Sequence, residues 1–216
     1  GAHTLATALT DNSWAIADSV SGTLNGIGFS GFKTLLGSDE NDVFSFANGV
    51  AFGGTIDGGK GNNLVDVSTG SQTKYELNEA QGSEINGVKN ATGVKGAGNL
   101  AQLTLVSPNK AAWSITGDNK GELTYAADNK KFSFEGVGVL VGGAGNDTFV
   151  FSAPTAKINR IEGGAQAQGG VDTVVAKTNQ ANLWTIGAGT SLDNSLAAAN
   201  GTAYLNDYDG IEDISG

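Results

Sequence analysis

The chain repeats itself, and this self-similarity limits its fold more than any other feature of the sequence. The segment FSGFKTLLGSDENDVFSF, Phe29 to Phe46, aligns without a gap on FEGVGVLVGGAGNDTFVF, Phe134 to Phe151, at an offset of 105 residues. A third copy begins as YDGIEDISG, Tyr208 to Gly216. Internal repeats are typical of stacked architectures, in which each unit buries its apolar face against its neighbours. We therefore expect a repeat fold.

A Trp-x-Ile triplet precedes each of the three copies, and Tyr75 and Leu77 take its place in a more degenerate unit between the first two. The triplets are Trp14 and Ile16, Trp113 and Ile115, and Trp184 and Ile186. We expect units to begin near residues 14, 73, 111 and 182. Residues 4–216 are then one segment of a longer repeat array, and residues 1–3, GAH, are interpreted as a remnant of tag cleavage.

Apolar residues alternate within the repeated elements, as in Phe44 and Phe46 or Val65 and Val67. A period of two indicates β-strands. Helical spacing is present only over Leu192 to Ala199. Between the strands stand Gly-Gly, Asn-Gly and Gly-Asn pairs, which supply the positive φ values of tight corners.

Equivalent glycines are spaced as one coil of a solenoid requires. Gly37 and Gly58 lie 21 residues apart, and so do Gly142 and Gly163. The predicted fold class is therefore all-β, a right-handed parallel β-helix (β-solenoid) of roughly 21-residue coils. The alternative is a tandem of antiparallel β-sandwich modules, which the unit spacing of roughly 60 to 100 residues also allows.

Composition restricts the partners and the setting. The chain has 22 acidic and 12 basic residues, a net charge of −10, and Arg160 is its only arginine. Counterion release could drive little binding to phosphates, so we expect no nucleic-acid partner. No apolar run reaches the length of a membrane span, so we expect no membrane insertion. The absence of cysteine excludes disulfides and thiolate metal sites.

The combination of WxI, FxGFxxLxGGxGNDTFxF and IxGGxGxDTVxxS resembles the repeats of giant bacterial surface and secreted proteins of the filamentous-haemagglutinin-like, "β-strand repeat" type. The resemblance covers nearly the whole chain from about Trp14 onward. It implies a β-helical scaffold or stalk segment of an extracellular or cell-surface adhesin that serves adhesion, aggregation or biofilm matrix. It also implies extracellular polysaccharide or cell-surface glycan as a partner.

GGAGNDTFV, Gly142 to Val150, is similar to the calcium-binding nonapeptide of RTX β-rolls. Calcium takes six to eight oxygen ligands, which acidic corners could supply. The alternative is that these side chains close the corner turns and accept hydrogen bonds from backbone amides. No other cofactor is expected. The candidate metal ligands are Asp39, Asp42, Asp57, Asp147 and Asp172.

The residues bear on three further roles, namely sugar stacking, catalysis and ligand binding. The tryptophans could stack on sugar rings, but paired with isoleucine at period two they are expected to point inward. Catalysis is not expected, because the carboxylates recur with the repeat, whereas an active site has no reason to recur. A ligand surface would lie where the repeat is least regular, over Gln72 to Asn109 or Asp118 to Lys131. The open strand edges predict end-to-end association.

Overall fold

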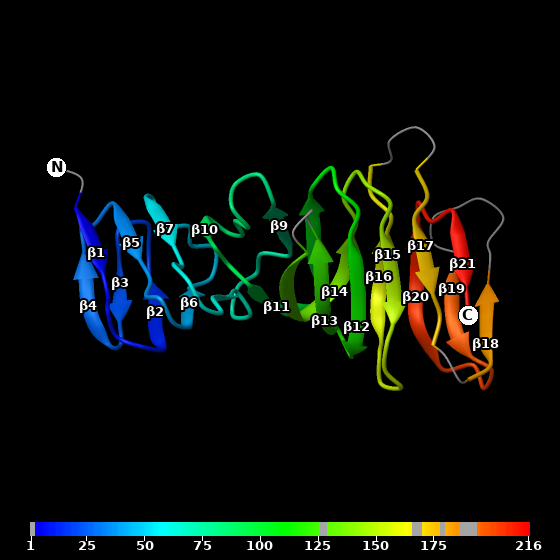
Figure 1. The fold of residues 1–216 in the computed structure, drawn as a ribbon. Helices are drawn as coiled ribbons and strands as arrows, with labels where there is room; N and C mark the ends of the chain where they lie inside the picture. Colours follow the sequence, from blue (N-terminus) through cyan, green and yellow to red (C-terminus); the bar gives the residue numbers. More distant parts are fainter. Residues whose placement is uncertain (1–2, 126–128, 166–169, 178–179, 186–193) are drawn as a thin grey trace.

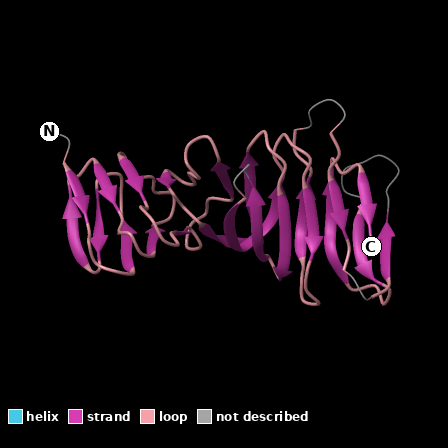
Figure 2. Ribbon diagram, viewed as in Figure 1, coloured by secondary structure: helices cyan, strands magenta, loops and turns pink. Residues whose placement is uncertain are grey.

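The chain forms an elongated all-β structure, as the repeat pattern predicts. The structure is a computed structural model that describes residues 3–125, 129–165, 170–177, 180–185 and 194–216. Within these ranges every regular element is a β-strand, and none is a helix that could span a membrane (Figure 2). The strands lie side by side along the long axis, with the N-terminus and the C-terminus toward opposite ends (Figure 1).

Most of the strands are short, with three to seven residues, and their bounds follow the alternating segments of the sequence. They are β1 (Thr4–Ala6), β2 (Asn12–Ile16), β3 (Ser21–Leu24), β4 (Ile27–Ser30), β5 (Thr34–Leu36), β6 (Asp42–Phe46), β7 (Thr55–Asp57), β8 (Leu64–Asp66), β9 (Lys74–Asn78), β10 (Val88–Lys89), β11 (Gly93–Val106), β12 (Ala112–Gly117), β13 (Lys120–Tyr125), β14 (Lys130–Val141), β15 (Thr148–Phe151), β16 (Ile158–Glu162), β17 (Thr173–Val175), β18 (Asn182–Thr185), β19 (Ser195–Ala198), β20 (Ala203–Asp209) and β21 (Asp213–Ser215).

Parallel pairing brings equivalent residues of successive repeats together. Phe44 of β6 lies between Trp14 of β2 and Val65 of β8, and all three strands run in the same direction. The step from Phe44 to Val65 is 21 residues, and the step from Leu140 of β14 to Ile161 of β16 is also 21. Elsewhere the parallel steps are longer, up to 47 residues from Ile161 to Tyr208. The predicted spacing is therefore correct at some steps and too short at others.

Antiparallel hairpins account for much of the sequence separation in these longer parallel steps. The alternation of apolar residues did not predict these hairpins. Each Trp-x-Ile strand begins a three-stranded antiparallel meander: β2-β3-β4, β12-β13-β14 and β18-β19-β20. In the first meander, Asn25 and Gly26 have φ values of 50° and 80°, which a two-residue hairpin turn requires. The expected helical stretch is also wrong over Ser195–Ala198, which is β19, while Leu192 and Ile186 lie outside the described residues.

Strand pairing defines three sheets. The long sheet has the order β4-β3-β2-β6-β8-β11-β14-β13-β12-β15-β17-β21. The second sheet joins the later parts of β11 and β14 in the order β9-β11-β14-β16-β20-β19-β18. The short sheet is β1-β5-β7-β10. The long sheet therefore runs from one end of the molecule to the other.

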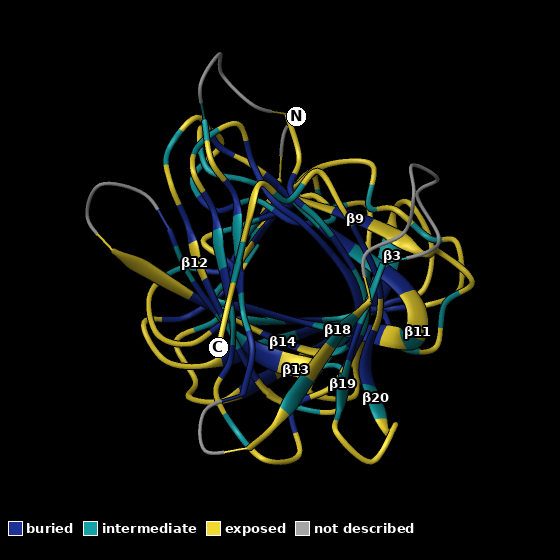
Figure 3. Ribbon diagram, turned by 90° about the vertical axis from the view of Figure 1, so that its right-hand side faces the viewer, coloured by how far each residue is buried: buried dark blue, intermediate teal, exposed yellow. Residues whose placement is uncertain are grey.

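The core is a row of apolar side chains along the inside of these sheets. Seen along the axis, the buried stretches face the middle and the exposed turns lie outside (Figure 3). Trp14 stacks on Phe44 with ring centroids 5.7 Å apart, and Trp113 stacks on Phe149 at 5.5 Å. All four rings have 0% exposure, so the period-two pattern correctly predicted that these residues point inward.

Candidate functional site

The acidic corner before β6 contains the first predicted metal ligand. Asp42 is fully buried where the chain turns from β5 into β6. Its Oδ2 accepts a hydrogen bond from the Ser38 amide at 2.7 Å, and its Oδ1 accepts one from the Trp14 indole Nε1 at 3.2 Å. The carboxylate therefore closes its own turn and holds the neighbouring tryptophan.

The equivalent corner before β15 has the same turn but a different second donor. Asp147 is fully buried, and its Oδ2 accepts a hydrogen bond from the Gly143 amide at 2.7 Å. Its Oδ1 accepts one from the Ala111 amide, also at 2.7 Å. A Cβ on Gly142 would lie only 2.4 Å from Asp147 Oδ2. Glycine is thus required where the backbone passes this close to the carboxylate.

The backbone amides of three corner residues each donate a hydrogen bond to the side chain of the next corner residue in the stack. Asn63 Oδ1 accepts the Asp42 amide at 3.2 Å, Asp172 Oδ1 accepts the Asp147 amide at 2.7 Å, and Glu212 Oε2 accepts the Asp172 amide at 2.7 Å. We call this arrangement the corner ladder; it comprises Asp42, Asn63, Asp147, Asp172 and Glu212. Buried amides need such partners, because an unsatisfied one costs about 1–3 kcal/mol. The ladder therefore supplies the hydrogen bonds that β-pairing leaves out at the corner.

Burial changes the acid–base chemistry of this ladder at one position. Desolvation, aided by the nearby Asp172 carboxylate, raises the pKa of Asp147 to about 7 although the two backbone donors oppose the rise. A pKa near neutrality suits a general acid or base. Asp147, however, has no exposed surface through which a substrate could reach it. Its arrangement instead suits a structural group whose charge depends on pH.

The two remaining candidate ligands lie apart from this buried ladder. Asp39 is exposed and forms an ion pair with Lys60 at 2.6 Å. Asp57 Oδ1 accepts hydrogen bonds from the Gly59 amide at 2.9 Å and from Asn90 Nδ2 at 2.7 Å. Among the described residues, no three acidic or histidine side chains are grouped as a metal site would need. Calcium binding stays a prediction, and the geometry places Asp57 in a turn and Asp39 in an exposed ion pair.

The tryptophans have different exposures along the chain. Trp14 and Trp113 are fully buried and are therefore not available to stack on a sugar ring. Trp184 is half-buried near the C-terminal end of the molecule, with its ring edge-on to Tyr208 at 6.0 Å. The prediction of inward-pointing tryptophans is confirmed for the first two. Trp184 is the tryptophan with a partly accessible ring.

The least regular segments do border hollows on the surface. A groove of about 430 Å³ crosses the turns after β9, β11, β14 and β16, and its apolar lining includes Leu105, Pro108 and Val141. A second hollow of about 320 Å³ lies beside β9, between Lys74 and Glu84. Asp118 to Lys131 contains the β13 strand of a hairpin and the start of β14, with residues 126–128 outside the described ranges. Neither hollow contains a catalytic grouping.

Sequence reasoning missed one polar cluster. Arg160 of β16 pairs with Glu162 at 2.9 Å, with Asp207 at 3.0 Å and with Asp209 at 3.9 Å. Asp207 and Asp209 lie opposite Arg160 and Glu162 on the neighbouring strand β20. Burial raises the pKa of Asp207, and Arg160 opposes this rise. The signal in the sequence is a single arginine within an acidic chain. Its partner on the neighbouring strand, Asp207, lies 47 residues away, so the sequence alone does not bring the two together.

Comparisons with known proteins do not assign this chain to a class. No protein-family model matches it, and neither a curated protein nor a solved structure matches.

Proposed function

We propose that the chain is a right-handed parallel β-helix that serves as a scaffold segment of a large secreted or surface-attached bacterial adhesin. The observation that carries the proposal is the continuous long sheet, in which two copies of the repeat follow one another along the axis (Figure 1). Crossovers between parallel strands of one sheet are almost always right-handed, which supports that hand. A structure that grows by adding repeats has the shape of a stalk.

The burial pattern supports a structural role for the repeated residues. The side chains that recur, Trp14 and Trp113 with Phe44 and Phe149, have no exposed surface. The corner carboxylates that recur, Asp42 and Asp147, accept hydrogen bonds from the turns. The repeat therefore uses its most distinctive residues for stacking. This favours a scaffold over an enzyme or a calcium-binding roll.

An extracellular setting, a role in adhesion, aggregation or biofilm matrix, and a polysaccharide or glycan partner belong to the same proposal. The resemblance of the repeats supports them. A net charge of −10 keeps such a stalk well solvated. If glycan binds, Trp184 is the tryptophan that it would meet, because its ring is half-buried whereas those of Trp14 and Trp113 are fully buried.

Small-angle X-ray scattering and ligand titration together test the scaffold proposal. Twelve strands in the long sheet at about 4.8 Å each predict a rod about 60 Å long. The scattering should fit a rod of constant cross-section, and anionic and neutral polysaccharides should move the tryptophan emission only through Trp184. A compact particle, or release of reducing sugar from any of these polysaccharides, would overturn the proposal.

A further inference from the structure

One face of the molecule contains two sheets that are equivalent in the repeat but do not join. In the short sheet Leu35 pairs with Ile56, and in the second sheet the equivalent Leu140 pairs with Ile161. The short sheet ends at β10, which pairs with β7, and the second sheet begins at β9, which pairs with β11. β10 and β9 follow one another along the molecule (Figure 1). No ladder joins these two strands in the described part of the chain, so the face has a break there.

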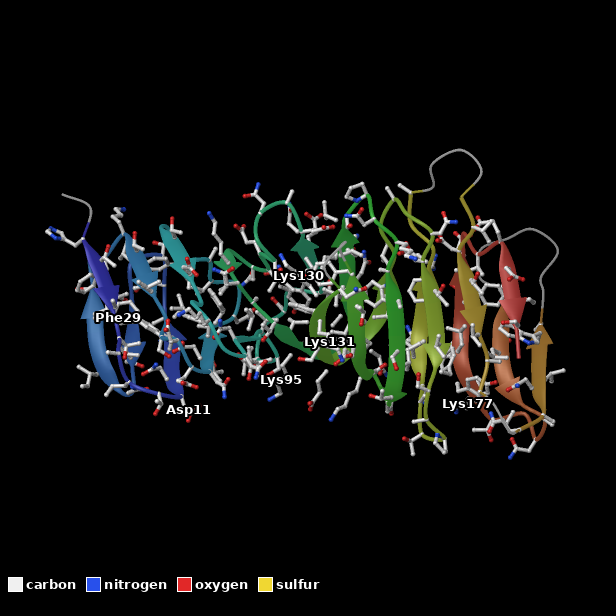
Figure 4. All side chains as sticks on the ribbon, viewed as in Figure 1. Asp11, Phe29, Lys95, Lys130, Lys131 and Lys177 are labelled. Carbon is white, nitrogen blue, oxygen red and sulfur yellow. The ribbon has the colours of Figure 1, made fainter. Side chains whose placement is uncertain are left out.

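This break lies inside the molecule and not at one of its ends. Lys95, which belongs to the strand after β10, lies midway along the molecule (Figure 4). Repeats added at either end of the rod would therefore not cover the break. It falls in the degenerate unit, where Tyr75 and Leu77 replace the Trp-x-Ile triplet. The strands of Trp14 and Trp113 each have a parallel and an antiparallel ladder, whereas β9 has only the parallel one among the described residues.

The open side of β9 presents backbone groups of Glu76 that are ready to pair. The Thr73 carbonyl and the Glu79 amide form hydrogen bonds with β11, and alternate residues of a strand point to the opposite side. Asn78 accordingly exchanges two backbone hydrogen bonds with Glu84, at 2.9 and 3.1 Å. Glu76 lies two residues earlier and faces the same side as Asn78. Within the described ranges, no backbone hydrogen bond reaches its amide or its carbonyl from that side.

The hollow of about 320 Å³ beside β9 lies where an antiparallel partner would continue. Glu84 and Asn86 border it, and the chain begins that partner at Glu84 but then turns away. Asn86 and Gly87 have φ values of 49° and 78°, as a two-residue hairpin turn requires. The Nδ2 of Asn86 is buried and has no hydrogen-bond partner in the described part of the chain. The fold therefore starts an antiparallel strand on β9 and stops it after one pair.

We propose that an extended peptide segment of a partner protein adds to β9 as an antiparallel strand in this hollow. The direction continues the pair of Asn78 with Glu84, so one residue of the segment lies opposite Glu76 and the residue two further on lies opposite Lys74. Glu76 and Lys74 are both exposed, and opposite charges directly across an antiparallel pair are stabilising. The residue between them faces inward, beside Tyr75. The segment therefore has the order basic, apolar, acidic, and its binding does not depend on the scaffold role.

Two capped pentapeptides test the order of charges, Thr-Lys-Val-Glu-Thr and its control Thr-Glu-Val-Lys-Thr. They have the same composition and net charge, so any general attraction to an acidic chain is the same for both. Calorimetric titration of the whole chain should give about tenfold tighter binding for the first peptide, because both charge pairs are attractive only in that order. The charge-swapped variant K74E/E76K changes two exposed side chains and should reverse the preference. Equal affinities, no binding of either peptide, or a preference that the variant does not reverse would overturn the proposal.

Removal of single backbone donors tests whether the contact is strand pairing. E76P deletes the free amide of Glu76, which takes no part in the ladder with β11, and should weaken binding of the first peptide about tenfold relative to E76A. N-methylation of the peptide lysine, whose amide faces the Glu76 carbonyl, should weaken binding to the unmodified chain by a similar factor. N-methylation of the peptide valine, whose amide points away from β9, should have a smaller effect. Equal losses from the two methylated peptides would show that no strand is added and would overturn the proposal, whether or not E76P folds.

Discussion

The two corner aspartates occupy the same place in the fold but have different neighbours. Asp42 holds the indole of Trp14, while at the second corner Asp147 takes the amide of Ala111 and the Nε1 of Trp113 has no hydrogen-bond partner among the described residues. The next position in the corner ladder is the neutral Asn63 in the first repeat and Asp172 in the second.

This difference shows which part of the corner the fold requires. Both repeats keep the bond from the carboxylate to the turn amide, at 2.7 Å in each, so the turn depends on that bond. The second donor and the charge of the next side chain vary. The second repeat consequently places two buried carboxylates, Asp147 and Asp172, next to each other in the corner ladder. We expect the two corners to have similar shape but different sensitivity to pH and to substitution.

The largest expected effect is a loss of stability between about pH 4 and pH 7 that originates at Asp147. Its pKa is raised from 3.8 to about 7 in the fold, so the folded state holds an extra proton over this range. The contribution of Asp147 to stability is then fully present below the pKa that it has in the unfolded chain. It is lost as the pH rises through the pKa that Asp147 has in the folded protein. A shift of this size corresponds to roughly 4 kcal/mol at most. Urea unfolding at several pH values measures it.

The control for this effect is D147N. The amide cannot titrate, so the free energy of unfolding of D147N should change less between pH 4 and pH 7 than that of the wild type. At pH 4, D147N should be less stable than the wild type by about 1–3 kcal/mol, because its amide nitrogen replaces one acceptor of a backbone hydrogen bond, and this deficit should shrink or reverse toward pH 7. Parallel pH profiles for the two proteins would contradict the assignment to Asp147.

The second effect concerns the two tryptophans, which stack in the same way but differ in hydrogen bonding. W14F leaves the buried Asp42 Oδ1 without its indole donor, whereas W113F removes a buried N–H that has no acceptor in the described part of the chain. Both variants lose similar packing volume. We expect W14F to be less stable than W113F by about 2 kcal/mol. Chemical unfolding of both variants measures the difference, and equal losses would show that the indole bond contributes nothing.

The sequence predicted the stacking in these corners better than it predicted the chain path between them. Alternation at Phe44 and Phe46 correctly placed those side chains inside, because a period of two leaves one face to be buried. The same sequence contained the hairpin signal Asn25-Gly26, which was interpreted only as a corner. Both interpretations require positive φ. Spacing alone could not distinguish a turn within one sheet from a bend between two.

The site was harder to predict, for a related reason. Asp42 and Asp147 were recognised as corner residues, but their donors Trp14 and Ala111 lie 28 and 36 residues away in sequence. The ladder arises from the stacking of distant segments. Its members therefore become apparent only once the register is known. Glu212, which accepts the amide of Asp172, does not match the repeat motif at all.

A smaller effect should follow from making the second corner resemble the first. D172N replaces the charged neighbour of Asp147 by the amide that the first repeat has at Asn63. Removing the repulsion lowers the pKa of Asp147, so the loss of stability above pH 4 should shrink by about 1 kcal/mol. Measuring the same unfolding profile in D172N tests this. An unchanged profile would mean that desolvation alone sets the pKa.

The smallest expected effect is that of calcium, and it tests whether the corners are already satisfied without a metal ion. Both oxygens of Asp42 and Asp147 accept hydrogen bonds, so binding would have to break these bonds before six to eight oxygens could be assembled. We expect the melting temperature to be the same in EDTA and in millimolar calcium. Specific binding at 100 times the dissociation constant would add about 2.7 kcal/mol. Such a rise in the wild type, absent in D147N, would make the second corner a calcium site.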